Sequence, residues 1–587
     1  MSKEALPGEC ALSRARGEAT APKDFDWVQK NIPCQAACPA GTDIPGYLDA
    51  IAHGEYAQAY RINLQDNVFP GVLGRVCTRP CEPPCRHGWE GLGEPVAICF
   101  SKRSAADQRA RAEPVLLDPV FPSTGKSVGV IGAGAAGLAA ARELRLWGHD
   151  VTVYERYRIP GGLMVQGIPA FRLPRDVVSL EIEQIQALGV TLRCGVEIGK
   201  TITVDQLLAE HDAVVLATGT HVPFIPDTPG RTRPGVRHGL DFLKDFNTLG
   251  TVPVGSRVVV IGGGFTAVDC ARVARRAGAE SVSVYYRRSE AEMYIGGHEV
   301  VEMKQEGIAF HPLTAPLAYC GPDEDGAVDR IQLAPTRLCE PGADGRRVPE
   351  IQADAVFEVE ADTVLLATGQ VRDLEHLGPT IQQACAAAPR DGSTANPQLF
   401  MAGDVALGAL SLIDAIGHAK ACARRVDRHL MERDRWRDIV WIEDAQGTGR
   451  TREMDEIPRH PMPVRPPEER GVIDEVETGF DEDHAQAEAQ RCYLCHYKYE
   501  IDNDCCIYCD RCLKVKPVEN CIVKVSALQF DEAGRITGYD RTTSAENYNL
   551  LYIDQNECIR CGACAEVCPV ECIPLQKVQT RTVPVKE

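Results

Sequence analysis

The sequence predicts a multidomain α/β protein, in which a central region of parallel-sheet folds is flanked by a cysteine-rich unit at each end. Three observations predict this architecture. The chain has 587 residues, more than one hydrophobic core normally serves. Apolar strands alternate with amphipathic helices from residue 126 to residue 432, the pattern of a parallel α/β fold. Most of the 25 cysteines fall within residues 34–99 and 492–572.

Composition excludes several classes of function. The 63 Lys and Arg residues face 83 Asp and Glu residues, and a chain with a net charge of −20 lacks the clustered cations that nucleic acids and anionic membranes require. The first residues contain no apolar stretch of a secretory signal, and no apolar run is long enough to span a bilayer. We therefore expect a cytoplasmic protein with no nucleic-acid or membrane partner. In a reducing cytosol, dense cysteines indicate bound metal rather than disulfides.

The first part of the central region carries the motif of a dinucleotide-binding fold. Gly132, Gly134 and Gly137 form G-x-G-x-x-G between a predicted strand and helix, and Glu155 ends the next strand. The glycines permit the tight turn, the approach of a pyrophosphate and the packing of helix on strand. The helix N-terminus favours the phosphates, and the carboxylate can accept hydrogen bonds from a ribose. The complete strand–turn–helix–strand context makes this motif specific.

A second copy of the motif follows. Gly262, Gly264 and Ala267 form G-x-G-x-x-A at the start of a predicted helix. The next strand ends in Arg287 and Arg288 instead of an acidic residue. Two guanidiniums at this position can pair with a 2′-phosphate, which favours NADP(H) over NAD(H). The alternative interpretation is that both arginines lie on a solvated strand end.

The central region resembles the flavoprotein reductases that contain two dinucleotide-binding domains. Each motif is followed by an apolar strand ending in Ala-Thr-Gly, at residues 217–219 and 367–369. The signature G-G-L…G-I-P-x-F-R-L-P within residues 161–178 is similar to that of the glutamate synthase small subunit and of the N-terminal half of dihydropyrimidine dehydrogenase. The resemblance implies two Rossmann-like domains, one for FAD and one for NAD(P). The redox C-x4-C of disulfide reductases is absent, so electrons need another exit from the flavin.

The resemblance also implies which residues contact each dinucleotide. In the family's C-terminal flavin segment, which LFMAGDVALGALSLIDAIGHA resembles, an aspartate contacts the ribityl chain and the next helix faces the isoalloxazine. The implied FAD contacts are Gly132, Gly134, Ala136, Gly137, Glu155, Arg156, Gly162, Leu163, Arg172, Thr218, Gly219, Gly403, Asp404, Ala415 and Ile416. The implied NAD(P) contacts are Gly262, Gly264, Phe265, Thr266, Ala267, Arg287, Arg288, Thr368 and Gly369. Hydride transfer between two cofactors needs no side-chain acid or base, so we expect no catalytic residue.

The N-terminal cysteines resemble the arm that binds two [4Fe–4S] clusters in the same family. The family's leading R-C-x-x-C is missing from the N-terminus and is found instead at Cys492 and Cys495, so we expect the chain to return across its linker. The family pairing implies a first cluster held by Cys34, Cys85, Cys492 and Cys495. It implies a second cluster held by Cys38, Cys77 and Cys81. Relatives complete the second cluster with Gln or Glu, but Lys102 occupies that position here. Cys99 is the expected replacement, and the identity of the fourth ligand stays open.

The C-terminal cysteines predict a two-cluster ferredoxin unit. Cys558, Cys561, Cys564 and Cys568 form C-x2-C-x2-C-x3-C-P, whereas structural zinc sites use separated pairs of ligands. Upstream, Cys506, Cys509 and Cys512 are followed by Lys516 where a fourth cysteine is expected. Because fourth cysteines swap between the clusters of such pairs, we expect Cys568 to serve the first cluster. The nearest donor for the second cluster is Cys521.

These observations predict an NAD(P)-dependent flavin–iron–sulfur oxidoreductase subunit with FAD and four [4Fe–4S] clusters. The expected domains are a helical [4Fe–4S] domain at 1–120, an FAD domain at 126–250 and 376–432, an NAD(P) domain at 251–375, an extended linker at 433–490 and an α+β ferredoxin-like domain at 491–587. We expect a hetero-oligomer with an electron-exchanging protein, such as a 2-oxoacid:ferredoxin oxidoreductase or a ferredoxin.

Two alternative functions remain open. The first alternative, which the resemblance implies, is a true glutamate synthase small subunit that feeds electrons to a large amidotransferase partner. The other alternative is a non-catalytic relay and docking subunit that has lost nucleotide binding. The intact glycines of both motifs argue against that loss, whereas Tyr294 and Phe265 depart from the family pattern near the nucleotide site.

Overall fold

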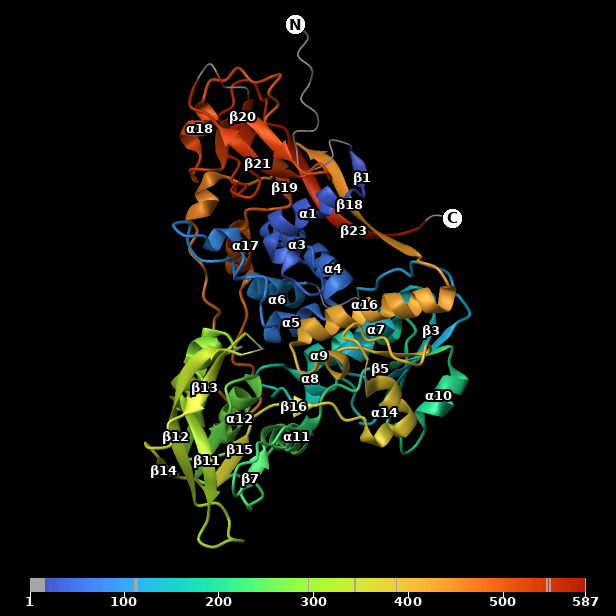
Figure 1. The fold of residues 1–587 in the computed structure, drawn as a ribbon, viewed down its shortest axis with the longest axis vertical. Coiled ribbons are helices and arrows are strands. Elements are labelled where there is room, and N and C mark those ends of the chain that lie inside the picture. The colour runs from blue at the N-terminus through green and yellow to red at the C-terminus, as the bar shows by residue number, and fades with distance from the viewer. Residues whose placement is uncertain are drawn as a thin grey trace.

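The computed structural model describes residues 16–109, 115–293, 295–342, 345–386, 388–544, 547 and 550–585. Tyr294 is therefore outside the described residues. In Figure 1 the ferredoxin unit (red) lies at one end of the long axis, and the N-terminal helices (blue) lie directly beneath it. The two dinucleotide-binding domains occupy the other end, which confirms the predicted α/β architecture with a cysteine-rich unit on each side.

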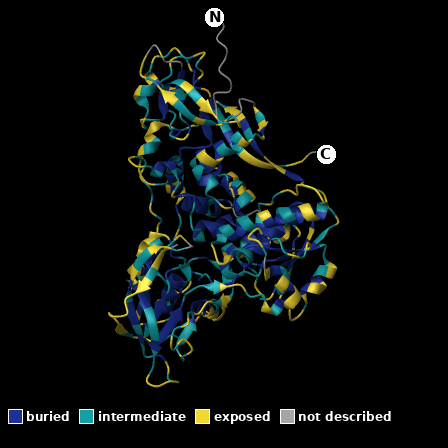
Figure 2. Ribbon diagram, viewed as in Figure 1, coloured by how far each residue is buried: buried dark blue, intermediate teal, exposed yellow. Residues whose placement is uncertain are grey.

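The N-terminal domain is a small helical bundle. Its helices are α1 (Pro22–Asn31), α2 (Pro33–Ala36), α3 (Ile44–Ala52), α4 (Tyr56–Asn67), α5 (Pro70–Val76) and α6 (Ile98–Gln108). Proline stands in the first turn of α1, α2, α3 and α5, where its missing N–H is not needed. A 3₁₀ turn, η1 (Arg86–Gly88), follows Cys85. Figure 2 shows that these helices are mostly buried, because the domain is covered from several sides.

The FAD domain contains a five-stranded parallel sheet in the order β17-β5-β2-β3-β4. Its strands are β2 (Ser127–Ile131), β3 (Asp150–Glu155), β4 (Thr191–Cys194), β5 (Ala213–Leu216) and β17 (Leu399–Met401). Its helices are α7 (Ala135–Leu146), α8 (Leu163–Gln166), α9 (Arg175–Ala187), α10 (Val204–Glu210), α14 (Pro379–Ala386), α15 (Asp404–Leu407) and α16 (Leu412–Met431). The long helix α16 packs on α7 and on the N-terminal helix α5. The flavin segment therefore contacts the helical domain.

The NAD(P) domain contains a second parallel sheet, in the order β10-β9-β8-β15-β7. Its elements are β7 (Val236–His238), α11 (Gly239–Leu249), β8 (Arg257–Ile261), α12 (Phe265–Arg276), β9 (Ser281–Tyr285), α13 (Gly297–Gln305), β10 (Ala309–His311) and β15 (Thr363–Leu366). An antiparallel sheet is inserted before β15 and consists of β11 (Thr314–Cys320), β12 (Arg330–Pro341), β13 (Arg347–Ile351) and β14 (Phe357–Glu360). The short strands β6 (Val222–Pro223) and β16 (Gln370–Val371) pair where the chain crosses between the two domains. Because β7 pairs with β15, this domain begins before residue 251.

The range expected to be an extended linker begins with a strand. Strand β18 (Trp436–Ala445) pairs along its whole length with β23 (Leu575–Pro584) and on its other edge with β1 (Gly17–Ala19). Strand β19 (Tyr497–Tyr499) completes this antiparallel sheet against β23. Ile439, Val440 and Ile442 of β18 are buried, so the segment belongs to a core rather than to a surface linker. The sheet joins β1 and β23 to β18, which follows the flavin-domain helix α16.

Residues 446–481 connect the helical domain with the NAD(P) domain. Glu475 forms ion pairs with Arg75 (2.7 Å) and Arg103 (2.9 Å) of the helical domain. Arg470 pairs with Glu306 of the NAD(P) domain at 3.0 Å. Helix α17 (Glu482–Gln490) then packs on α3 and α6 and delivers the chain to Cys492. This segment, residues 446–481, is called the strap below.

The ferredoxin unit combines short helices with a small sheet. Its elements are α18 (Arg511–Val515), β20 (Ile522–Phe530), β21 (Ile536–Arg541), β22 (Leu550–Ile553) and α19 (Ala563–Glu566). Strand β20 pairs with both β21 and β22. Among the described residues, no helix is both long enough and apolar enough to cross a membrane.

Candidate functional site

A cavity of about 1030 Å³ lies between the two dinucleotide-binding folds and is lined by residues of both motifs. Of the expected FAD contacts, the cavity is lined by Gly132, Gly134, Ala136, Glu155, Arg156, Gly162, Leu163, Arg172, Thr218, Gly219, Asp404 and Ala415. Of the expected NAD(P) contacts, it is lined by Gly264, Phe265, Thr266 and Gly369. The other expected contacts are outside the lining: Gly137, Gly403, Ile416, Gly262, Ala267, Arg287, Arg288 and Thr368.

Several residues outside the lining shape the loops that form it. A Cβ atom on Gly137 would lie 1.9 Å from the Gly132 carbonyl oxygen, so only glycine lets helix α7 approach strand β2. Ile416 and Ala267 are fully buried in the two domain cores. These residues therefore support the cavity through packing rather than by contact with a ligand.

The two helix N-termini offer open space for phosphate groups. A Cβ atom on Gly134 would meet nothing nearer than the Gly162 Cα at 3.9 Å, and one on Gly264 would meet nothing within 4 Å. Helices α7 and α12 begin at the next residue in each case. Free N–H groups and the positive end of each helix dipole therefore face the cavity, as pyrophosphate binding requires.

Glu155 is buried at the end of β3 and holds the first turn in place. Its carboxylate accepts hydrogen bonds from the N–H groups of Ala133 (2.7 Å) and Tyr157 (3.0 Å). Glu155 also lines the cavity. Its contact with a ribose remains a prediction.

Buried polar atoms without partners line the flavin side of the cavity. Asp404 Oδ1, Thr218 Oγ1 and Thr220 Oγ1 have no hydrogen-bond partner within the part of the chain that the structure describes. Burial, followed by the nearby Asp414 carboxylate, raises the pKa of Asp404 to about 7. Such groups would be costly unless a ligand with hydroxyl and amide groups satisfied them. The residues present therefore fit FAD.

Arg172 links the flavin signature to the NAD(P) domain. Its guanidinium donates to both carboxylate oxygens of Asp269 (2.9 and 3.0 Å) and to Glu299 (2.5 Å). Burial raises the pKa of Glu299 to about 7 although Arg172 opposes this shift. Arg172 thus lines the cavity while its charge is directed to two carboxylates of the neighbouring domain.

The two arginines expected to bind a 2′-phosphate differ in their surroundings. Arg287 is exposed, whereas Arg288 is buried and its Nε donates to the Arg347 carbonyl at 2.9 Å. That carbonyl belongs to the first residue of β13, and Arg346, the last residue of the connection between β12 and β13, lines the cavity. Sequence reasoning did not identify Arg346, because it is far from both glycine motifs and its only signal was the basic pair at 346–347.

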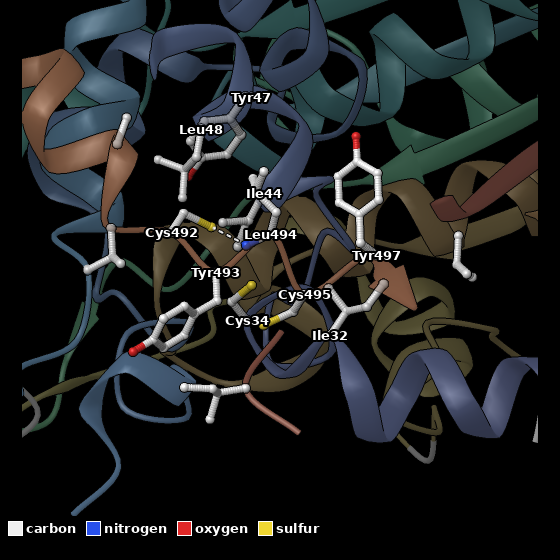
Figure 3. Close-up of a cluster of buried hydrophobic side chains, with 14 of the residues drawn as sticks. Ile32, Cys34, Ile44, Tyr47, Leu48, Cys492, Tyr493, Leu494, Cys495 and Tyr497 are labelled. Atoms are coloured by element: carbon white, nitrogen blue, oxygen red, sulfur yellow. Dashed lines mark hydrogen bonds between the residues drawn. The ribbon is translucent and has the colours of Figure 1, made fainter. Parts of the chain in front are cut away.

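The displaced cysteine pair returns to the N-terminal domain. Cys34, Cys85, Cys492 and Cys495 line one cavity between the helices and the segment after α17. Figure 3 shows Cys34 and Cys495 side by side with Cys492 near them. Burial raises the pKa of the Cys34 thiol, and the other cysteines add to that shift. These four cysteines are called the fold-back set.

A second group of cysteines lies beside the large cavity. Its members, called the flavin-proximal set, are Cys38, Cys77, Cys81 and Cys99. The Cys99 thiol lowers the pKa of Cys77, and burial raises the pKa of Cys81, with contributions from the thiols of Cys38 and Cys99. The dinucleotide cavity is lined by Val76, Thr78 and Pro80, which are sequence neighbours of Cys77 and Cys81. The expected fourth donor, Cys99, lies beside Cys77 and Cys81.

Lys102 is buried beside the flavin-proximal set. Its Nζ donates to Asn67 Oδ1 at 3.1 Å. Burial alone would lower the pKa of Lys102, but the thiols of Cys77 and Cys99 raise it above its usual value. Lys102 is therefore a cation next to the cysteines rather than a ligand.

The ferredoxin unit brings its cysteines together in two groups. The outer ferredoxin set, Cys506, Cys509, Cys512 and Cys568, lines one cavity. Cys572 lines the same cavity, with its sulfur 3.4 Å from that of Cys568. Cys572 was not among the expected ligands, because the spacing of the motif is complete without it.

The inner ferredoxin set consists of Cys521, Cys558, Cys561 and Cys564. Cys521 interacts electrostatically with Cys558 and Cys561, and Cys564 interacts with all three. Lys516, at the position of a missing cysteine, donates instead to the carbonyls of Glu519 and Ile522. The structure thus places Cys521 where the expected donor is needed.

The geometry of these groups suits clusters better than single ions. In the described ranges, no group of three or more His, Cys, Asp or Glu side chains converges closely enough to hold one metal ion. The fold-back and outer ferredoxin sets instead surround cavities. A multi-iron cluster, which separates its ligating sulfurs, fits cysteines arranged around a cavity.

Two buried arginines separate the fold-back set from the inner ferredoxin set. Arg86 follows Cys85 directly, and its guanidinium donates to the carbonyls of Gln555 and Cys558. Arg560 donates to the same two carbonyls. Burial, and next the charge of Arg560, lower the pKa of Arg86 to about 10, so it stays charged at neutral pH.

Comparison with known proteins identifies the class of protein. The chain belongs to the pyridine nucleotide-disulphide oxidoreductase family, whose model matches residues 126–425, about half of the chain. Residues 28–113 match the family "dihydropyrimidine dehydrogenase domain II, 4Fe-4S cluster", and residues 551–573 match the "4Fe-4S binding domain". The chain is therefore an FAD-dependent NAD(P)H oxidoreductase that carries [4Fe–4S] clusters.

Several curated relatives are subunits of oxidoreductases. The NADP(+)-dependent formate dehydrogenase subunit beta of Moorella thermoacetica is 36% identical over 530 residues, which cover 82% of this chain and 73% of that protein. The NADPH-Fe(3+) oxidoreductase subunit beta of Geobacter sulfurreducens is 34% identical, covering 79% and 75%. The glutamate synthase [NADPH] small chain of Azospirillum brasilense is 34% identical, covering 67% and 85%. The expected resemblance to glutamate synthase small subunits is thus confirmed, and the chain is an NADPH-dependent flavin and iron–sulfur electron-transfer subunit.

Solved structures match part of the chain at low sequence identity. Mycobacterium tuberculosis FprA in complex with NADPH matches 52% of this chain and 85% of its own, with a TM-score of 0.47 and 18% sequence identity.

Proposed function

We propose that this chain transfers electrons between NADPH and a partner protein through FAD and four [4Fe–4S] clusters arranged in one series. The series begins at the dinucleotide cavity and continues through the flavin-proximal set and the fold-back set. It then crosses to the inner ferredoxin set and ends at the outer ferredoxin set.

The proposal rests on one observation: the dinucleotide cavity and the sets of cysteines lie next to one another in order. Thr78 in the wall of the dinucleotide cavity lies between Cys77 and Cys81 in the sequence. After burial, the thiols of Cys495 in the fold-back set and of Cys81 in the flavin-proximal set both raise the pKa of Cys34, so the two sets lie near each other. At the far end, Cys509 is exposed and Ile507 is 58% exposed, so the outer ferredoxin set reaches the surface.

The chain's own residues position and isolate the cofactors. The open glycine loops before α7 and α12 receive the phosphates, and Asp404 offers its carboxylate to the flavin side of the cavity. FAD, when bound, accepts a hydride and gives up single electrons, which links a two-electron donor to one-electron clusters. Burial of the fold-back set among Ile44, Leu48 and Tyr493 excludes water from the series.

The partner in this proposal is a protein that exchanges single electrons with the outer ferredoxin set, such as a ferredoxin or a 2-oxoacid:ferredoxin oxidoreductase. The names of the relatives support a role in an oxidoreductase complex. The formate dehydrogenase and Fe(3+) oxidoreductase subunits each match about four fifths of this chain. A glutamate synthase role is less favoured, because the glutamate synthase small chain matches about two thirds of it.

The proposal is tested by anaerobic reduction of the purified holoprotein with NADPH. We expect the flavin absorbance to bleach and the iron–sulfur absorbance to decrease, because the series connects both. Iron analysis should give about 16 irons per flavin, at four irons per cluster. If NADPH leaves the flavin oxidised, the chain is the non-catalytic relay subunit instead.

A further inference from the structure

Arg86 and Arg560 form a pair of buried cations at the junction between the helical domain and the ferredoxin unit. Each side chain is about 1% exposed. Asn31, at the end of α1, accepts hydrogen bonds from both guanidiniums at its Oδ1, 3.0 Å from Arg86 Nη2 and 2.8 Å from Arg560 Nη2. The two like charges therefore share one amide oxygen and the two carbonyls already described.

No carboxylate neutralises this pair among the residues that the structure describes. All of the oxygen partners are neutral: the carbonyls of Lys30, Tyr497, Gln555 and Cys558, and the amide of Asn31. By contrast, the equally buried Arg491 pairs with Glu488 at 2.6 Å. Two buried cations without a counter-charge are strongly unfavourable, so a negative charge of another kind is required.

The cysteines on the two sides of the pair supply such a charge. Arg86 interacts electrostatically with Cys495 and Cys34 of the fold-back set and with Cys558 of the inner ferredoxin set. Arg86 also connects the two sets directly, because it follows Cys85 in the chain and its guanidinium donates to the carbonyl of Cys558. A cluster with four thiolate ligands carries net negative charge, which increases by one on reduction.

We infer that Arg86 and Arg560 are the shared counter-charges of two [4Fe–4S] clusters, which raise the reduction potentials of both and make the junction the crossing point for electrons. The inference rests on the proposed function and deepens it by naming the residues that connect its two halves. A nearby cation stabilises the reduced form of a cluster, because reduction adds a negative charge. Both arginines act through their charge on the clusters, and neither contacts a substrate in this proposal.

Asn31→Asp provides an isosteric test. The new carboxylate would lie within hydrogen-bond distance of both guanidiniums and would neutralise part of their charge without opening a cavity. In a redox titration of the holoprotein monitored by electron paramagnetic resonance, we expect two of the clusters to become harder to reduce. Their equilibrium constants for reduction should fall about tenfold, equivalent to about 59 mV for one electron. Arg86→Met should have the same effect, and Arg86→Lys should largely restore the potentials.

A matched control is Arg142→Met. Arg142 is also buried and also donates to backbone carbonyls, those of Leu64 and Gln65, but unlike Arg86 it has a carboxylate partner, Glu143. It lies on α7, and none of the described contacts connects it to a cysteine. Its substitution should leave all cluster potentials unchanged. If Asn31→Asp and Arg86→Met also leave them unchanged while iron remains about 16 per flavin, the inference is wrong. Failure of the proposed function is distinguishable, because NADPH would then fail to reduce the wild-type flavin whatever the potentials are.

Discussion

At the scale of single residues, the two arginines after β9 have different roles, one as an exposed charge and the other as a structural contact. Arg287 is exposed, while Arg288 fixes the Arg347 carbonyl and with it the connection that carries Arg346 into the cavity. Replacing Arg287 by Ala should therefore remove one charged contact to the 2′-phosphate without moving this connection. A charged hydrogen bond contributes about 1.5–3 kcal/mol, so the specificity constant for NADPH should fall by roughly ten- to 150-fold.

The measurement for this prediction is steady-state reduction of an artificial electron acceptor with NADPH and with NADH. The rate with NADH should not change in Arg287→Ala, because NADH lacks the 2′-phosphate. A wild-type protein that uses NADH as efficiently as NADPH would contradict the assignment of the 2′-phosphate site.

A second residue-scale prediction concerns Asp404 and pH. Its pKa is raised to about 7, and the charged form is the better acceptor for ribityl hydroxyls. Protonation as the pH falls through 7 weakens this acceptor, so FAD affinity should decrease with acidification. In Asp404→Asn the affinity should be about tenfold or more lower and independent of pH between 6 and 8. The FAD affinities of both proteins are measured by the fluorescence of the flavin that is released. A wild-type affinity that does not vary with pH would contradict the role of Asp404.

At the scale of elements, the strap and α17 determine where the second cysteine zone folds. The strap is anchored by Glu475 to Arg75 and Arg103, and α17 follows it to Cys492. The fold-back set is therefore assembled from segments more than 400 residues apart. Substituting both Cys492 and Cys495 with Ala should remove one cluster and lower iron from about 16 to about 12 per flavin.

The control for this prediction is substitution of two buried cysteines that lie in the flavin domain. Cys385 and Cys422 are fully buried in hydrophobic clusters and line none of the cysteine cavities. Replacing them with Ala should leave the iron content per flavin unchanged and should lower only the free energy of unfolding. If the Cys492 and Cys495 variant also retains about 16 irons, the N-terminal arm completes its clusters without them.

At the scale of the whole molecule, the sequence predicted the domain classes and the meeting of distant cysteines better than it predicted contacts between domains. The glycine motifs and cysteine spacings depend on local chemistry, which a sequence displays directly. Strand β18 was missed, because alternation in WRDIVWIEDA is short and its partner β23 lies at the other end of the chain. Arg86 and Arg560 were missed for the same reason, since only the packed junction brings them together.

The order of the cofactor series makes a final prediction about the whole molecule. Replacing both Cys558 and Cys561 with Ala should remove the cluster of the inner ferredoxin set, which lies between the fold-back set and the surface. NADPH should still bleach the flavin at the wild-type rate, because the dinucleotide cavity is in another domain. Reduction of an added ferredoxin should fall by at least tenfold, since the outer set loses its connection, and iron should be about 12 per flavin. Ferredoxin reduction at the wild-type rate would show that electrons leave the protein before the ferredoxin unit, and the proposed order would be wrong.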